Sequence, residues 1–200
     1  MKADEVFSDQ LEGWLGSDAP KTLGGLGAVF AEKSFAVTVL LLMFVPSLPL
    51  PTGGITHVFE AITVVLATQM VLGRRTIWLP ERWRRRELSA ATTGRAIPFM
   101  IRRIRWFERF SRPRWAQLFE QRWFVRLLGL VFIGLAVAAA IAPPFSGLDT
   151  LPAMGAVAVA LAIILEDVIV LAIGVAIGTG GVILIFTVGA ALVRVVRTFL

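Results

Sequence analysis

The chain has 200 residues, 56% of them hydrophobic, no cysteine and a formal net charge of +6. An ordinary soluble domain is about 45–50% apolar. Because a soluble core of this size could not bury the excess, the composition predicts an all-α, polytopic helical membrane protein. The lack of cysteine excludes disulfide bonds and thiolate metal sites. The start of the chain is acidic and polar, so we expect internal apolar segments, and not a secretory signal peptide, to direct it to the membrane.

Residues 1–21 are expected to form an acidic amphipathic helix. Phe7, Leu11, Trp14 and Leu15 follow the spacing i, i+4, i+7 and i+8, which places them on one face of a helix. The opposite face is acidic, which is the wrong sign for binding to anionic lipid. We therefore expect this helix to dock on an arginine-rich segment, in the same chain or in a neighbouring subunit.

Residues 22–73 form the first hydrophobic half, whose two membrane segments flank a proline-rich break at 46–54. Because lipid supplies no hydrogen bonds, a backbone interrupted by proline must lie at the interface, line a cavity or be shielded by protein. The break is therefore either a loop that joins two antiparallel spans or part of a re-entrant helix, a device that transporters use to expose backbone groups to a solute. Residues 143–152 present the same alternatives in the second half.

Residues 74–123 are a linker rich in arginine and tryptophan. Residues 74–126 contain fifteen of the twenty basic residues, all arginine, and the linker contains five of the six tryptophans. An arginine run can bind nucleic acid, but apolar segments adjoin both ends of this one, which is typical of a cytoplasmic loop. We therefore expect short helices that lie on the cytoplasmic face of the membrane. The predicted lipid- or partner-binding surface comprises Arg74, Arg75, Trp78, Arg84, Arg85, Arg86, Arg102, Arg103, Arg105 and Trp106.

Residues 124–200 form the second hydrophobic half, with membrane segments expected at about 124–142, 151–165 and 168–198. The first of these would reach about 28 Å as a helix, enough to cross a bilayer. A glycine-rich turn is expected at 178–181, because a hairpin there would return the two C-terminal arginines to the cytoplasmic side, as the charge bias of membrane loops favours. The predicted helix-break residues of both halves are Pro46, Pro49, Pro51, Pro143, Pro144, Gly178, Gly180 and Gly181.

Two spacings recur in both halves and indicate an internal repeat. A charged pair followed by an apolar run precedes Pro46 and also precedes Gly178. In addition, Pro46 lies 23 residues before Gln69, as Pro143 lies 23 residues before Glu166. Either correspondence would relate the two hydrophobic halves.

Five polar residues lie in or beside the predicted membrane segments, where an ionisable group is a functional candidate. His57 and Glu60 are three apart and share a helix face; they form either a proton-accepting pair in a cavity or a solvated pair at the outer interface. Gln69 is expected to form a hydrogen bond to another helix. Glu166 and Asp167 point to different faces, and one of them is expected to pair with a linker arginine at the inner interface.

Four stretches of the sequence resemble the ExoD exopolysaccharide synthesis family of bacterial membrane proteins. They are "FVPSLPLPTGG", "ATQMVLGRRTIWLPERWRRR", "SRPRW" and "LPAMGAVAVALAIILEDVIVLAIG", and their order covers roughly residues 22–180. The resemblance implies an inner-membrane protein linked to exopolysaccharide production. It implies no known reaction, and therefore no catalytic residues.

The sequence contains no metalloprotease, P-loop or nucleophile-elbow motif, so we expect no enzyme, no catalytic or metal-binding residues and no cofactor. We expect a multi-pass inner-membrane protein, with its N-terminus and linker in the cytoplasm, that supports exopolysaccharide production or envelope homeostasis. The alternative is a small transporter or channel for protons, ions or a lipid-linked solute. Expected partners are membrane lipids, the exopolysaccharide-synthesis machinery and, because several glycines would permit close helix approach, a second copy of the chain; nucleic acid is not expected.

Overall fold

The computed structural model describes residues 7–22, 25, 33–48, 55–74, 76–78, 81–85, 87–88, 90, 92–110, 115–142 and 146–199. The regular structure of these residues is helical, and an isolated antiparallel bridge joins Thr22 to Glu87. The predicted all-α fold is confirmed. Within the described residues, the helices at Arg122–Ile141 and Val168–Ala191 are long and apolar enough to cross a membrane, as expected of a helical membrane protein.

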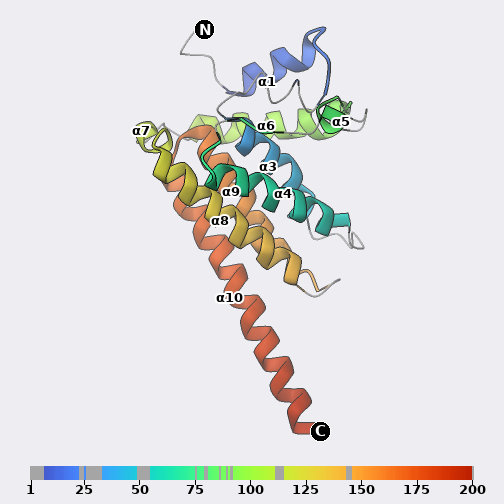
Figure 1. Cartoon of the computed structure of the whole chain (residues 1–200), viewed down its shortest axis with the longest axis vertical. Helices are drawn as coiled ribbons and strands as arrows, with labels where there is room; N and C mark the ends of the chain where they lie inside the picture. Colours follow the sequence, from blue (N-terminus) through green and yellow to red (C-terminus); the bar gives the residue numbers. More distant parts are fainter. Residues whose placement is uncertain are drawn as a thin grey trace.

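Five apolar helices form a bundle (Figure 1): α3 (Ser34–Phe44), α4 (Ile55–Val71), α8 (Arg122–Ile141), α9 (Thr150–Leu165) and α10 (Val168–Phe199). Helix α4 packs on α8, α3 packs on α9, and α10 packs mainly on α9. The first four helices begin and end within a few residues of the apolar runs in the sequence. The runs predict these helices well because each one ends at a proline segment or at charged residues.

Helix α8 is apolar both on the face that packs against the other helices and on the opposite, exposed face. Phe132 and Ala136 are fully buried, whereas Leu127, Leu130 and Ile141 are exposed on the opposite side of the same helix. A row of exposed large apolar side chains has no stable place in water. This pattern is typical of a helix with one face in a protein core and the other in lipid.

Four of the five bundle helices form two helix–proline segment–helix pairs, residues 34–71 and 122–165, which pack through α4 on α8 and through α3 on α9. Pro46 is buried and follows the last turn of α3, where a residue without a backbone N–H ends the helix. Pro143, with which the second predicted correspondence aligned Pro46, lies outside the described residues, and the internal repeat stays a prediction. The other predicted break prolines, Pro49, Pro51 and Pro144, also lie outside the described residues.

The predicted turn at 178–181 is wrong, because α10 continues as one helix from Val168 to Phe199. Gly178 and Gly181 are not break residues. A Cβ atom added to Gly155 would lie 2.4 Å from Gly178 Cα, and one added to Gly181 would lie 2.6 Å from Pro152 Cδ, so glycine lets α9 and α10 approach closely. Gly180 is also inside the helix, and a Cβ atom there would meet nothing within 4 Å.

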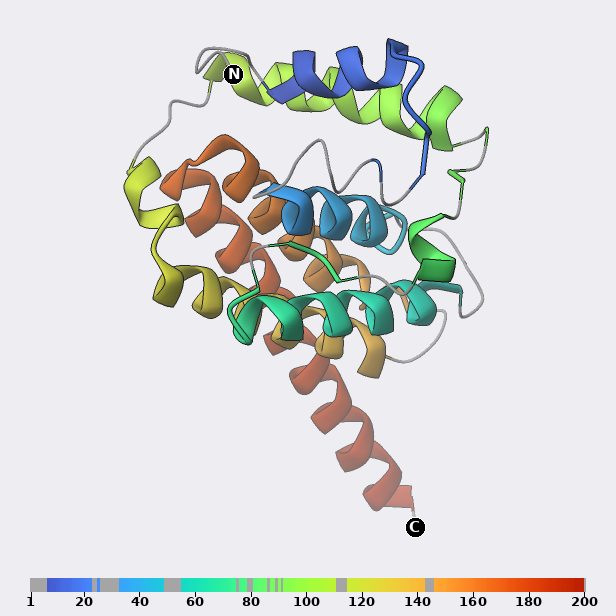
Figure 2. The same ribbon diagram turned by 45° about the horizontal axis from the view of Figure 1, so that its top comes forward.

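The C-terminal half of α10 projects from the bundle (Figures 1 and 2). Its side chains Ile183, Phe186 and Val188 are exposed and apolar. In the predicted hairpin, the second helix would have covered this surface. The continuous helix instead leaves it without a protein neighbour among the described residues.

A second layer lies across the end of the bundle at which α3 and α10 begin (Figure 2). It consists of α1 (Phe7–Gly16) on α6 (Ile97–Phe110). Leu11 and Trp14 of α1 are buried, as the helical stripe predicted, and the buried face of α6 repeats at helical spacing. The linker also contains α5 (Glu81–Arg84), a π-helical turn at Thr92–Ala96 and α7 (Ala116–Phe119); this agrees with the predicted short helices.

Candidate functional site

The predicted docking of the acidic helix on the arginine-rich segment is confirmed within one chain. Arg105 of α6 places Nη2 3.0 Å from Asp9 Oδ1 and 2.5 Å from Glu12 Oε2, both on α1. The hydrogen bond to Glu12 raises the pKa of the Arg105 guanidinium, which therefore stays charged. Arg105, a member of the predicted lipid- or partner-binding surface, therefore forms its ion pairs within the chain.

The remaining arginines of that surface differ in their contacts. Arg102 and Arg103 are exposed on α6, and the Arg103 guanidinium carbon lies 5.2 Å from the centroid of the Phe99 ring. Arg85 pairs with Glu81 at 2.9 Å. Among the predicted members, Arg75, Arg86 and the side chain of Arg84 lie outside the described residues.

Lys33 holds the junction between α9 and α10 by pairing with Glu166, where a linker arginine was one expected partner; for Asp167 the predicted arginine pair stays a prediction. Lys33 Nζ lies 2.7 Å from Glu166 Oε1 and donates a hydrogen bond of 3.0 Å to the carbonyl oxygen of Ile164. Glu166 adopts a left-handed conformation (φ 54°) and ends α9. Asp167 is buried, and its Oδ1 accepts a hydrogen bond of 2.9 Å from the N–H of Ile169, as an N-cap of α10 would.

Lys33 is the residue that the sequence reasoning missed. A lysine directly before an apolar run can be recognised in the sequence as a candidate site residue. Its partner lies far away in the sequence and is brought to it only because α3 packs on α9.

Gln69 was expected to reach another helix, and this prediction is wrong. Its side-chain Oε1 accepts a hydrogen bond of 2.8 Å from the N–H of Trp78, and its Nε2 donates one of 3.3 Å to the carbonyl oxygen of Trp78. A side-chain amide can pair in this way with both the backbone N–H and the backbone carbonyl of one residue. Gln69 therefore fixes the start of the basic linker against the end of α4.

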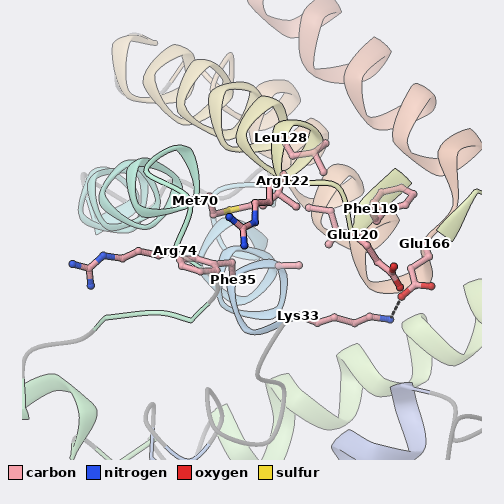
Figure 3. A pocket seen from close by; sticks show the side chains of 13 residues that line it. Lys33, Phe35, Met70, Arg74, Phe119, Glu120, Arg122, Leu128 and Glu166 are labelled. Atoms are coloured by element: carbon pink, nitrogen blue, oxygen red, sulfur yellow. Dashed lines mark ion pairs between the residues drawn. The ribbon is translucent and has the colours of Figure 1, made fainter. Parts of the chain in front are cut away.

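A pocket of about 480 Å³ opens at this basic end of the bundle, where α3 and α8 begin and where α4 and α9 end. Its charged lining comes from Lys33, Arg74, Glu120, Arg122 and Glu166. Figure 3 shows Arg122 in the middle of this lining, with Arg74 on one side and the Lys33–Glu166 pair beside Glu120 on the other. The pocket therefore has an arginine side and a side on which the charges of Lys33 and Glu166 neutralise each other.

At the other end of α4, His57 and Glu60 form a pair. His57 Nδ1 lies 2.8 Å from Glu60 Oε2; the Glu60 side chain is 0% exposed and that of His57 is 41% exposed. Glu60 Oε1 is buried and has no hydrogen-bond partner in the described part of the chain. Of the two predicted alternatives, the geometry favours a buried carboxyl with a half-exposed histidine over a fully solvated pair.

The described residues contain no group of three or more histidine, cysteine, aspartate or glutamate side chains that could hold a metal ion. The polar residues predicted from the sequence thus separate into two places. Gln69, Glu166 and Asp167 lie at the basic end, and His57 and Glu60 lie near the proline segments.

Comparison with known proteins identifies the family. The profile of the family described as "Exopolysaccharide synthesis, ExoD" matches residues 7–187. An uncharacterized protein of Synechocystis is 26% identical over 127 residues, which cover 64% of this chain and 59% of that protein. No solved structure gives a significant match. Because the family profile spans most of the chain, the protein belongs to the ExoD exopolysaccharide synthesis family.

Proposed function

We propose that this chain is a multi-pass component of the bacterial inner membrane that supports exopolysaccharide production without catalysing a reaction. Membership of the ExoD family supports the process. The observation that carries the proposed location is the basic end of the bundle, where exposed arginines and exposed indole rings gather beside apolar helices. The indole rings that are more than half exposed are those of Trp78, Trp106, Trp115 and Trp123.

Indole rings favour the headgroup layer of a membrane, and arginines favour its phosphates and the cytoplasmic side. We therefore place α6 on the inner leaflet, with Arg102 and Arg103 towards the lipid phosphates. In this orientation α10 carries Arg194 to the outer side. Arg194 on the outer side departs from the tendency of basic residues to lie on the cytoplasmic side. The fifteen arginines between residues 74 and 126 outweigh this single residue.

The proposed role is structural, in envelope homeostasis or in assembly with the exopolysaccharide-synthesis machinery. Composition supports it, since the chain has no cysteine and one histidine, and His57 is engaged with Glu60. The layer of α1 on α6 would be the surface that other cytoplasmic-side proteins meet.

Deletion and complementation test this proposal. Deletion of the gene is expected to lower the amount of secreted polymer, and the intact gene to restore it. A chain with Arg102→Gln and Arg103→Gln should restore less polymer at equal protein abundance, whereas Arg194→Gln, at the opposite end, should restore it fully. Unchanged polymer in the deletion strain would refute the role in exopolysaccharide production.

One observation favours a second candidate function, a small proton or ion transporter. The buried Glu60 carboxyl has an unpartnered oxygen and a half-exposed histidine beside it, and ionisable groups inside membrane bundles often mark proton paths. Proteoliposomes that contain a pH-sensitive dye test it. A proton flux lost with Glu60→Gln but kept with the exposed control Glu81→Gln would support transport; no flux of any common cation with the intact chain would exclude it.

A further inference from the structure

Two arginines that line the pocket come from different elements: Arg74 from the turn that follows α4, and Arg122 from the start of α8. Gly73 makes this turn with a positive φ of 81°, and Arg74 follows it directly. A Cβ atom added to Gly73 would lie 3.2 Å from Arg126 Nη2, so the guanidinium of Arg126 lies against the turn. Gly73, Arg74 and Arg122 all line the pocket.

Neither of the two arginines that line the pocket forms an ion pair with a described residue, although Glu120 and Glu166 also line it. Arg105, by contrast, pairs with two acids of α1, and Arg85 pairs with Glu81. In the pocket itself, Glu166 is engaged by Lys33, and Glu120 lies on the same side of Arg122 as that pair in Figure 3. Arg122 is also the first residue of α8, so the positive end of that helix dipole lies at the same place.

The wall below these charges is apolar. Phe35, Met70 and Leu128 line the pocket together with the arginines. A volume of about 480 Å³ exceeds what a phosphate group alone would fill and lies within the range of small-molecule sites. The site therefore combines fixed positive charge with room for an apolar substituent.

We propose that this pocket binds a phosphate group that is attached to an apolar chain, with Arg122 as its central ligand and Arg74 beside it. Guanidinium groups suit phosphate oxygens because their planar N–H donors form paired, charge-assisted hydrogen bonds. The inference deepens the proposed function, on which it rests only for the position of the pocket at the inner leaflet. Such a phosphate group can come from a lipid headgroup or from a free phosphate compound, and binding measurements separate the two sources.

The test uses the full chain purified in an uncharged detergent and native mass spectrometry. The probes are phosphatidic acid, phosphatidylcholine and inorganic pyrophosphate. We expect one tightly held phosphatidic acid per chain, and a dissociation constant at least about tenfold higher for Arg122→Gln and for Arg74→Gln, because each variant loses a charged hydrogen bond. The control is Arg194→Gln, which removes the same charge at the opposite end of the molecule.

The outcomes distinguish the sources. Loss of binding in the pocket variants, with phosphatidic acid retained in the presence of millimolar pyrophosphate, assigns the site to a lipid headgroup. Displacement by pyrophosphate, with the same dependence on Arg122, assigns it to free phosphate compounds. Equal weakening by Arg194→Gln, or equal retention of phosphatidylcholine, overturns the proposal. Because this binding is measured outside a membrane and apart from polymer secretion, its failure leaves the proposed function to its own test.

Discussion

The close approach of α9 and α10 makes a quantitative prediction for Gly155→Ala. The new Cβ atom would lie 2.4 Å from Gly178 Cα and 2.6 Å from Gly178 N, whereas ordinary contacts begin near 3.4 Å. Both clashing atoms are backbone, so no side chain can rotate away and the two helices must separate. Overpacking of this kind costs about 1–3 kcal/mol, and we expect the upper end of that range.

Alanine recovers part of this cost, because glycine is about 1 kcal/mol less favourable than alanine inside a helix. The net loss in the free energy of unfolding is therefore about 2 kcal/mol, or roughly a thirtyfold shift of the folded-to-unfolded ratio. Unfolding in mixed micelles with increasing dodecyl sulfate, followed by circular dichroism, measures it.

The matched control is Gly180→Ala on the same helix pair. A Cβ atom at Gly180 would meet nothing within 4 Å, so this variant should be as stable as the parent chain or more so. If Gly155→Ala is as stable as the parent chain, α9 and α10 do not approach each other this closely. The packing of a continuous α10 along α9 would then be wrong.

Three further predictions concern the basic end of the bundle. Gln69→Leu should cost about 1–2 kcal/mol, since it removes two hydrogen bonds, and should speed tryptic cleavage of the linker; Thr68→Val on the exposed side of α4 is its control. Lys33→Glu should lower the unfolding midpoint, and the double variant with Glu166→Lys should recover most of the loss, as expected of a direct ion pair. Arg105→Gln should loosen α1, which hydrogen exchange of α1 amides would detect; an unchanged exchange rate would show that the apolar contacts of α1 suffice without the ion pairs.

The helices of the bundle could be predicted from the sequence because each apolar run has a physical end. Pro46 cannot donate a backbone hydrogen bond, so α3 ends at Phe44. The arginines before Phe124 mark the start of α8, which begins two residues earlier, at Arg122. Such local signals need no knowledge of the tertiary fold.

The turn at 178–181 was predicted from its glycines and from the charge bias of membrane loops, and both arguments fail here because α10 is one continuous helix. A helix in lipid keeps its backbone hydrogen bonds because no water competes for them. The more informative signal was the spacing of Gly174, Gly178 and Gly181, which places them on the packed side of α10: Gly174 and Gly181 face α9, and Gly178 faces Leu135 of α8. These three glycines are used within the chain, so they give no support to the predicted homodimer, which stays a prediction.

The partners of the polar residues could not be read from the sequence. Glu166 meets Lys33 only because α3 packs on α9, and Gln69 meets Trp78 only because Gly73 turns the chain back over the end of α4. The same holds for the pocket arginines. Arg74 and Arg122 lie near opposite ends of the linker in the sequence, and the fold brings both to one pocket. The sequence thus identified the polar residues, but their partners depend on how the helices pack.

The central claim is that the basic end of the bundle and the end that carries the proline segments lie on opposite sides of the inner membrane. Because the chain has no cysteine, Ala90→Cys and Ser146→Cys each introduce a single thiol, one at each end. In right-side-out spheroplasts, a membrane-impermeant maleimide should label residue 146 at once and residue 90 only after the membrane is opened. Immediate labelling of residue 90, or equal labelling of both, would contradict the account.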